Sequence, residues 1–300
     1  MNRPIAFLGA TSSIGIRPYD NGAPRQLDRA PAMLRELHLV ERLGAIDLGD
    51  VAAPPYRDYV RPPARVRNEA ELEEYCRSLG GRIAEAMMSG HFVLLAGGDC
   101  SIVLGALLGG RHTTGRPVGL VYVDAHADFA TPETSLTGSA ASMCLAMAVG
   151  RGDTPLARLG GSEVLARPEH VALIGRRDHE EGWYGHDALA ASGILDLADA
   201  AIREHGAAAA GRRALDQVAL ADSRSFWIDV DADVFDPSIV PAVDSPIRGG
   251  LHTAALAELL APLIAHPGAL GLELTIYDPA LDPQRTSARH LGNFLAEVLR

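Results

Sequence analysis

Two short stretches of the chain combine carboxylates and an imidazole in a pattern that suits metal chemistry. The first holds Asp124, His126 and Asp128, directly after the apolar run 118–123. Side chains at alternate positions of extended backbone share one side, so these three groups are expected to converge. The second stretch ends an apolar run that starts at residue 226, and it carries carboxylates at three alternate positions: Asp229, Asp231 and Asp233.

Closely spaced carboxylates repel one another strongly unless a cation lies between them. Two such clusters at two strand ends therefore predict a pair of divalent metal ions, about 3.5–4 Å apart with a shared water molecule. A lone aspartate at a strand end is more often a turn residue, and we interpret Asp236, before Pro237, in this way. Asp229 has two open interpretations: a carboxylate that orients a metal ligand, or a strand-end residue that faces solvent.

The elements that must position these clusters alternate along the whole chain. Apolar runs typical of buried strands are found at 5–8, 45–48, 91–96, 118–123, 171–174, 194–196, 226–230 and 269–276. Helical patterns lie between them at 30–43, 68–90, 102–108, 138–149, 198–221, 253–264 and 286–300, with Asn68 and Thr253 as expected caps. This alternation predicts one α/β domain, residues 1–300, whose parallel sheet has helices on both faces. Ligand sites in such sheets gather at the carboxyl ends of the strands.

Composition narrows the classes of partner. The net charge of −11 argues against nucleic acid or an anionic membrane as a partner. No apolar run approaches the length of a membrane span, and the run 5–8 is too short for a signal peptide. The three cysteines, Cys76, Cys100 and Cys144, form no disulfide framework, which favours a reducing compartment. We therefore expect a cytoplasmic protein.

The order and spacing of three motifs resemble those of the ureohydrolases, the family of arginase, agmatinase and formimidoylglutamase. These motifs are Gly97-Gly98-Asp99-Cys100-Ser101, the cluster 124–128, and the segment 231–237. Supporting segments lie at 131–132, 174–178, 249–251 and 278–282, so the resemblance covers nearly the whole chain. It implies an arginase-like, doubly wound, three-layer α/β/α fold with a mostly parallel central sheet. It also implies two manganese ions that hydrolyse a linear C–N bond of a guanidine or amidine.

The resemblance further implies a set of metal ligands. Asp124 and Asp231 would bridge the two metals. The other four ligands would be divided between them, Cys100 and Asp128 on one, His126 and Asp233 on the other. Asp128 would accept a hydrogen bond from the attacking hydroxide and later pass a proton to the leaving amine. Asp128 and His126 are accordingly the predicted catalytic residues.

The chain departs from the family at Cys100, where most members have histidine. A thiolate at a helix N-terminus has a lowered pKa and can bind metal. Because sulfur is a softer donor than imidazole, Cys100 would bias a manganese site towards zinc, iron or cobalt. The alternative is that Cys100 is a small buried residue and that one metal is weakly held.

Arginine recognition also departs from the family. Ala130 and Ala141 stand where arginases have a substrate-binding asparagine and a proton-shuttling histidine. Ile276 aligns with the glutamate that binds the guanidinium. Glu273 should face the opposite side of that strand, and we interpret it as the partner of a basic group inside the strand.

Five side chains remain as possible replacements for the missing groups. His179 and His186 are candidates for a new general acid. Asp178 and Glu180, together with Glu273, are the candidate substrate contacts.

The first hypothesis is therefore an amidinohydrolase with two metals, acting on a small guanidine or amidine other than arginine. Hydroxyguanidines and acylated guanidines are among the possible substrates, and a homo-oligomer is the expected assembly. The alternative is a catalytically diverged relative that binds metal for structure or regulation. An amide deacetylase is a third possibility, which the Gly-Gly-Asp motif and the spacing of the 231–236 aspartates disfavour.

Overall fold

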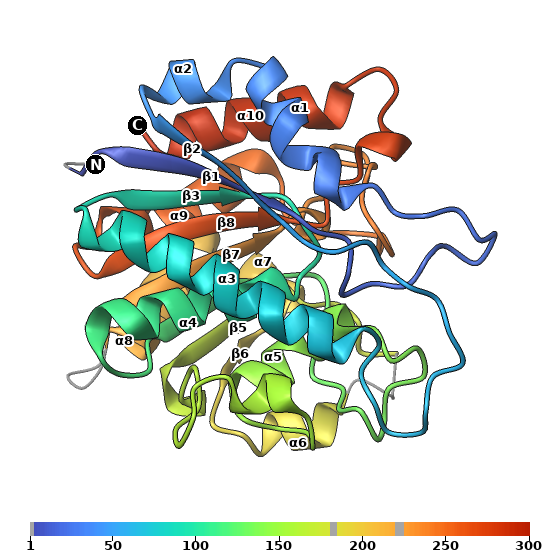
Figure 1. The fold of residues 1–300 in the computed structure, drawn as a ribbon. Coiled ribbons are helices and arrows are strands. Elements are labelled where there is room, and N and C mark those ends of the chain that lie inside the picture. Colours follow the sequence, from blue (N-terminus) through green and yellow to red (C-terminus); the bar gives the residue numbers. More distant parts are fainter. Residues whose placement is uncertain (1–2, 181–184, 220–224) are drawn as a thin grey trace.

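The computed structural model describes residues 3–180, 185–219 and 225–300, and its centre is one parallel sheet (Figure 1). Its eight strands follow the order β2-β1-β3-β8-β7-β4-β5-β6, and all neighbours are parallel. The strands are β1 Ile5–Thr11, β2 Ile46–Ala52, β3 Phe92–Ala96, β4 Gly119–Val123, β5 Val171–Ile174, β6 Leu195–Leu197, β7 Phe226–Asp231 and β8 Ala269–Thr275. The predicted α/β fold with a mostly parallel sheet is confirmed.

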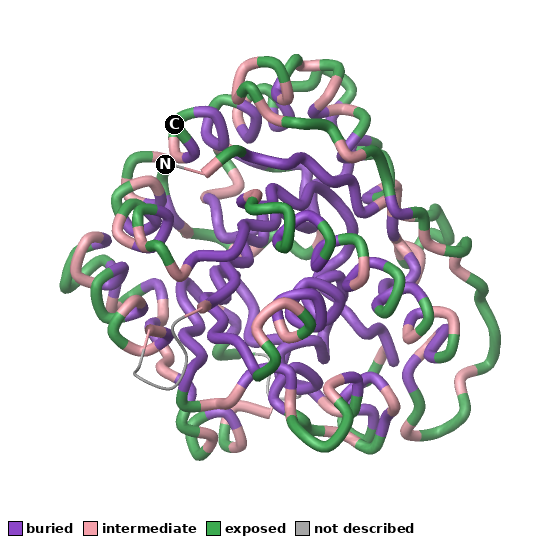
Figure 2. The backbone as a smooth tube through the Cα atoms, turned by 60° about the vertical axis from the view of Figure 1, so that its left-hand side comes forward, coloured by how far each residue is buried: buried purple, intermediate pink, exposed green. Residues whose placement is uncertain are grey.

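Helices cover the sheet on both faces. They are α1 Ala30–Glu36, α2 Leu39–Leu43, α3 Glu69–Met88, α4 Ile102–Thr114, α5 Cys144–Ala148, α6 His186–Ala190, α7 Asp199–His205, α8 Ala207–Val218, α9 Thr253–Ala265 and α10 Thr286–Val298. Helices α3 and α4 lie in front of the sheet in Figure 1 and α9 lies behind it, packed against α8 and α10. This three-layer arrangement explains why β3, β4, β5, β7 and β8 are buried along their whole length (Figure 2).

Glycines bring α3 and α4 unusually close together. A Cβ placed on Gly109 of α4 would lie 2.8 Å from the carbonyl oxygen of Gly80 on α3. Side chains larger than hydrogen would therefore separate the two helices. This contact matters for the site because α4 begins directly after the Gly-Gly-Asp-Cys-Ser motif.

Several expected boundaries differ from the observed ones. The predicted helix 30–43 is two helices, because His38 has φ 56° between them. Asn68 makes no capping bond, because its side chain bonds to the backbone of Arg57 instead. Thr253 is the first residue of α9, and its hydroxyl contacts His290.

Two predicted helices are also subdivided. The segment 138–149 forms a 3₁₀ turn followed by α5, and the segment 198–221 forms α7 and α8, with residues 220–221 outside the described part.

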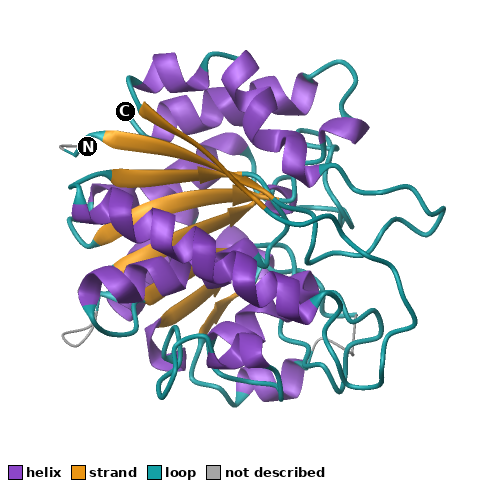
Figure 3. Cartoon of the chain, viewed as in Figure 1, coloured by secondary structure: helices purple, strands orange, loops and turns teal. Residues whose placement is uncertain are grey.

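The carboxyl ends of the strands share one side of the molecule, where the long loops also gather (Figure 3). Both predicted metal-binding clusters follow strands that end on this side. Among the described residues, no helix combines the length and the apolar composition that a membrane span requires.

Candidate metal centre

Neighbouring strands bring the two acidic clusters together. Val123, the last residue of β4, is in register with Val230 of β7, so Asp124 and Asp231 leave the sheet side by side. Asp128 curls back over this point through a left-handed backbone conformation, with φ 44°. An aspartate tolerates that conformation better than most residues.

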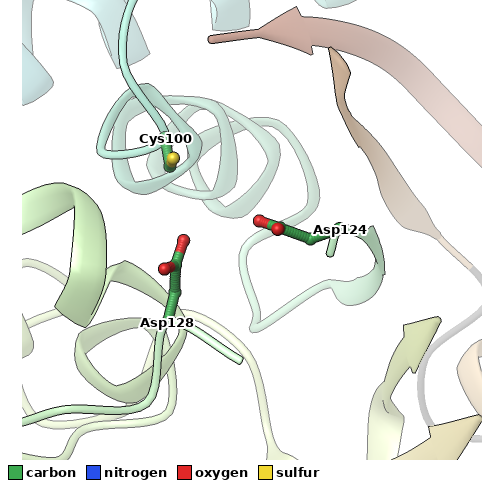
Figure 4. Close-up of side chains that lie close together, drawn as sticks. All are labelled: Cys100, Asp124 and Asp128. Carbon is green, nitrogen blue, oxygen red and sulfur yellow. The ribbon is translucent and has the colours of Figure 1, made fainter. Parts of the chain in front are cut away.

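A first group of possible ligands converges from two loops. Ligand atoms of Cys100, Asp124 and Asp128 all lie within 4.8 Å of one another, and all three residues are buried. Figure 4 shows the three side chains directed into a common space. Cys100 reaches it from the turn after β3, where Gly97 and Gly98 both adopt positive φ.

A second group shares one member with the first. Ligand atoms of Asp124, His126 and Asp233 also lie within 4.8 Å of one another. The Nδ1 atom of His126 is 2.8 Å from Oδ2 of Asp233 and 3.6 Å from Oδ1 of Asp124. Asp124 is therefore placed between two possible metal positions.

Asp231, the sixth predicted ligand, lies beside the first group. Its Oδ2 atom accepts hydrogen bonds from Cys100 Sγ at 3.4 Å and from Thr275 Oγ1 at 3.3 Å. Its Oδ1 atom accepts from the backbone N–H of Asp233 at 2.8 Å. The structure thus brings all six predicted ligands to one place.

Burial and mutual repulsion perturb the acids of this cluster. Burial, together with the charges of Asp233 and Asp128, raises the pKa of Asp124 well above its usual value. Burial also raises the pKa of Asp231, with Asp233 and Asp124 adding to the effect. Burial alone would lower the pKa of His126, but the neighbouring carboxylates of Asp233 and Asp124 raise it well above its usual value. Such a site favours any added positive charge.

The donor set fits divalent cations. Oδ2 of Asp124 is buried without a hydrogen-bond partner, which leaves a lone pair directed into the cluster. Carboxylate, imidazole and thiolate donors are the ligands of zinc and related metals, and carboxylates also suit manganese. The six residues therefore fit two divalent ions.

A pocket of about 160 Å³ opens above the cluster, which is room for a small molecule. Its floor includes Cys100, His126, Asp128 and Asp233. Its walls are formed by Ile16, Arg17, Arg25, Ser139, Ala141, Asp244 and Ile276, among others. Ile276 has φ 61°, a strained conformation for a β-branched residue, and its N–H donates to the carbonyl of Gly98.

None of the three predicted substrate contacts lines this pocket. Asp178 is buried and accepts a hydrogen bond from the N–H of Ala127, so it holds the 124–128 loop in place. Glu180 is exposed. Glu273 is fully buried in β8, in register with Asp229 of β7.

The predicted basic partner of Glu273 is wrong, and so is the solvent-facing interpretation of Asp229. The two carboxyl groups are fully buried beside each other, and burial raises the pKa of each. Glu273 therefore has another acid beside it instead of a base, and Asp229 does not face solvent. Asp236 accepts from the N–H of Ser238 at 2.8 Å, as expected of a turn residue.

The proposed replacements for the general acid lie elsewhere. His179 is exposed, with Nδ1 3.0 Å from the guanidinium of Arg176. His186 opens α6, and its ring centroid is 6.4 Å from that of His179. Neither histidine lines the pocket, whereas Ala141 does.

Two residues of the site were not singled out from the sequence. Tyr122 donates a hydrogen bond from its hydroxyl to Oδ2 of Asp128 at 2.6 Å, and Cys144 approaches the same atom at 3.4 Å. Tyr122 lies two positions before Asp124, on the face of β4 that carries the cluster. That spacing is the signal that could have found it, whereas Cys144 gave none.

The structure thus combines a parallel α/β/α fold with buried groups of possible metal ligands at the strand ends. The arginase family model matches residues 3–299. The chain is 30% identical over 308 residues to an arginase of Bacillus caldovelox, covering 95% of this chain and 94% of that protein. An arginase of Bacillus subtilis is 29% identical over 306 residues, covering 100% and 98%.

The comparison with solved structures agrees with these sequence matches. The structure of the Bacillus caldovelox arginase has a TM-score of 0.87 at 26% identity, covering 99% of this chain and 98% of that one. The chain therefore belongs to the arginase family.

Proposed function

We propose that this protein uses two divalent metal ions to hydrolyse a small guanidine or amidine other than arginine. The observation that carries the proposal is the position of Asp124, which belongs to both buried ligand groups, while other members of each group line a small pocket. A shared carboxylate is how two ions are held close enough to act on one water molecule. When bound, the ions would supply a water molecule activated for attack on the amidine carbon.

Asp128 is the proposed proton carrier. Its carboxyl group lies on the pocket floor, where it could accept a proton from a metal-activated water molecule and release it again. Tyr122 holds one of its oxygens. The Asp128 carboxylate would take a proton from the attacking water and deliver it to the amine that leaves. His126 would serve beside it as a ligand of the second group.

The walls of the pocket argue against arginine. Ile276 offers no charge to a guanidinium, and the only lining carboxylate outside the six ligands, among the described residues, is that of Asp244. That carboxylate is already paired with Arg25 at 2.7 Å. Burying an uncompensated cation typically costs several kcal/mol. Less basic guanidines and amidines avoid this cost.

The donor atoms determine which metal the site would prefer. Manganese suits the carboxylates, and a thiolate from Cys100 would shift the preference towards zinc, iron or cobalt. A catalytically diverged relative is the second candidate function, because Ala141 and Ile276 give the pocket walls no group for acid catalysis or guanidinium binding.

The test compares urea or ammonia release from a panel of guanidines and amidines with metal content measured on the same protein. We expect two metals per chain, release from a weakly basic substrate, and little release from arginine. Ile276→Glu should raise kcat/KM for arginine by at least about tenfold, because it restores a counter-charge. Ile276→Gln, of similar size without the charge, is the matched control and should not.

Two results would contradict the proposal. Efficient arginine turnover by the unmodified protein would overturn the substrate assignment. Full metal loading without release from any member of the panel would favour the diverged relative.

A further inference from the structure

A second cysteine reaches the metal-binding cluster from a different element. Cys144 is the first residue of α5 and is fully buried. Its Sγ atom lies 3.4 Å from Oδ2 of Asp128 and 3.0 Å from the hydroxyl of Tyr122. Neither the sequence motifs nor the reaction proposed above gives this thiol a role.

The two thiols of the site are neighbours. Both lie beside Asp128: Cys100 has a ligand atom within 4.8 Å of a ligand atom of Asp128, and Cys144 Sγ is 3.4 Å from its Oδ2. The third cysteine, Cys76, is separate from them, because its Sγ atom faces the carbonyl of Ser101 at 3.9 Å. One corner of the cluster thus contains two sulfurs and a carboxylate.

We propose that Cys144 is a second sulfur ligand of the metal ion that Cys100 would bind. The inference rests on the metal centre of the proposed function. A tetrahedral zinc with bonds of about 2.3 Å to sulfur and about 2.0–2.2 Å to oxygen places neighbouring sulfur and oxygen ligands about 3.5 Å apart. Two such pairs are seen here at that spacing: Cys144 with Asp128, and Cys100 with Asp231, each at 3.4 Å.

Two sulfur ligands would change which metal the site selects. Thiolates favour zinc, cobalt and iron over manganese, and a pair of them does so more strongly than one. The other metal position, formed by Asp124, His126 and Asp233, has no sulfur. The two positions should therefore prefer different metals within one centre.

The rival role for Cys144 is a hydrogen-bond donor that only orients Asp128. Cobalt(II) distinguishes the two roles, because a cobalt–thiolate bond produces a charge-transfer absorption band in the near ultraviolet. The experiment loads the reduced, full-length protein with cobalt(II) and records this band. Cys144→Ser and Cys100→Ser should each reduce the band by about half, because each removes one of two sulfur bonds.

Cys76→Ser is the matched control, since it changes a buried cysteine outside the cluster, and it should leave the band unchanged. An undiminished band in Cys144→Ser would overturn the proposal and leave Cys144 as a donor to Asp128.

A second measurement needs no variant and so does not depend on the variants folding. X-ray absorption spectroscopy of the zinc-loaded wild-type protein, at one zinc per chain, counts the sulfurs bound to the metal. Two sulfurs support the proposal and a single sulfur overturns it. Neither result depends on turnover. Failure to hydrolyse any substrate would therefore reject the proposed function, whereas the sulfur count alone decides this ligand assignment.

Discussion

Asp128 is the proposed proton carrier of the site, and its own backbone conformation and Tyr122 fix its orientation. Its left-handed backbone turns the carboxyl group towards β4, where Tyr122 holds one oxygen. Burial raises the pKa of Tyr122 well above its usual value, so its hydroxyl stays protonated and donates. Tyr122 therefore fixes the Asp128 carboxyl group within the first group of possible ligands.

We therefore expect Tyr122→Phe to weaken metal binding by about 10–100-fold, the usual effect of losing a group that orients a metal ligand. The stability of the metal-free protein should fall by about 1–3 kcal/mol, because a buried carboxyl loses its donor. Competition with a chelator of known affinity measures the first effect, and urea unfolding measures the second.

Tyr277→Phe provides the control for that prediction. Its hydroxyl donates to Asp282 at 3.0 Å, so the same atom is removed from a bond that does not involve the ligands. Tyr277→Phe should cost stability without changing metal affinity. If both variants bind metal as the wild type does, Tyr122 does not position Asp128.

At the scale of elements, the contact between α3 and α4 decides where the Cys100 turn sits. Gly80 and Gly109 allow the two helices to approach backbone to backbone, and Leu79 and Ile83 of α3 pack against the same strip of α4. Because the turn leads directly into α4, a displaced α4 would move Cys100 relative to Asp124.

Gly109→Ala tests this contact. Alanine is the better helix former, so propensity alone would stabilise α4 by about 1 kcal/mol. The new methyl group would instead meet the carbonyl of Gly80 at 2.8 Å, and overpacking of this kind typically costs about 1–3 kcal/mol. We expect a net loss of stability in chemical denaturation.

Gly81→Ala is the matched change on α3, since a methyl group there would meet nothing within 4 Å. It should stabilise the protein by about 0.5–1 kcal/mol. A gain in both variants would show that the helices do not depend on the close approach.

At the scale of the whole molecule, an acid pair lies at the centre of the sheet. Asp229 of β7 and Glu273 of β8 are in register and fully buried. Burial raises the pKa of Glu273 from its ordinary 4.5 to about 8. The folded protein therefore keeps a proton that the unfolded chain has already lost at neutral pH.

This pair should make global stability fall as the pH rises. A folded pKa above the unfolded one gives stability that is complete below about pH 4.5 and is lost as the pH passes about 8. The full effect for one group is on the order of 5 kcal/mol. Glu273→Gln should reduce the fall in stability between pH 5 and 9, measured by urea unfolding at each pH.

Glu258→Gln, on the exposed side of α9, is the comparison that should preserve the wild-type dependence. A wild-type stability that is constant over this range would argue against a protonated carboxyl at Glu273.

The sequence predicted the order of strands and helices and the parallel sheet, because these follow from the hydrophobic pattern along the chain. Apolar strands alternating with helices specify a parallel sheet, and aspartates at alternate positions beyond strand ends must meet at its edge. Asp124 and Asp231 therefore met as expected. Tyr122 was missed because it reads as one more apolar residue of a buried strand.

The contacts that the sequence did not predict depend on the register between strands and on residues that are distant in the sequence. Only the pairing of β7 with β8 places Glu273 beside Asp229, and no local pattern encodes that pairing. Cys144 reaches the cluster through the path of the loop between Asp128 and α5. Asn68 failed as a cap because a distant backbone segment, at Arg57, competed for its side chain.

The left-handed turn at Ile276 has a consequence for how the protein could change over time. Its backbone is held by the bond from its own N–H to Gly98, which does not involve the isoleucine side chain. A different side chain can therefore enter the pocket at this point without rebuilding the loop around it. Substrate preference could then drift by single replacements at one codon while the metal ligands, on other strands, stay unchanged. Substrate specificity could in this way change during evolution with little loss of stability.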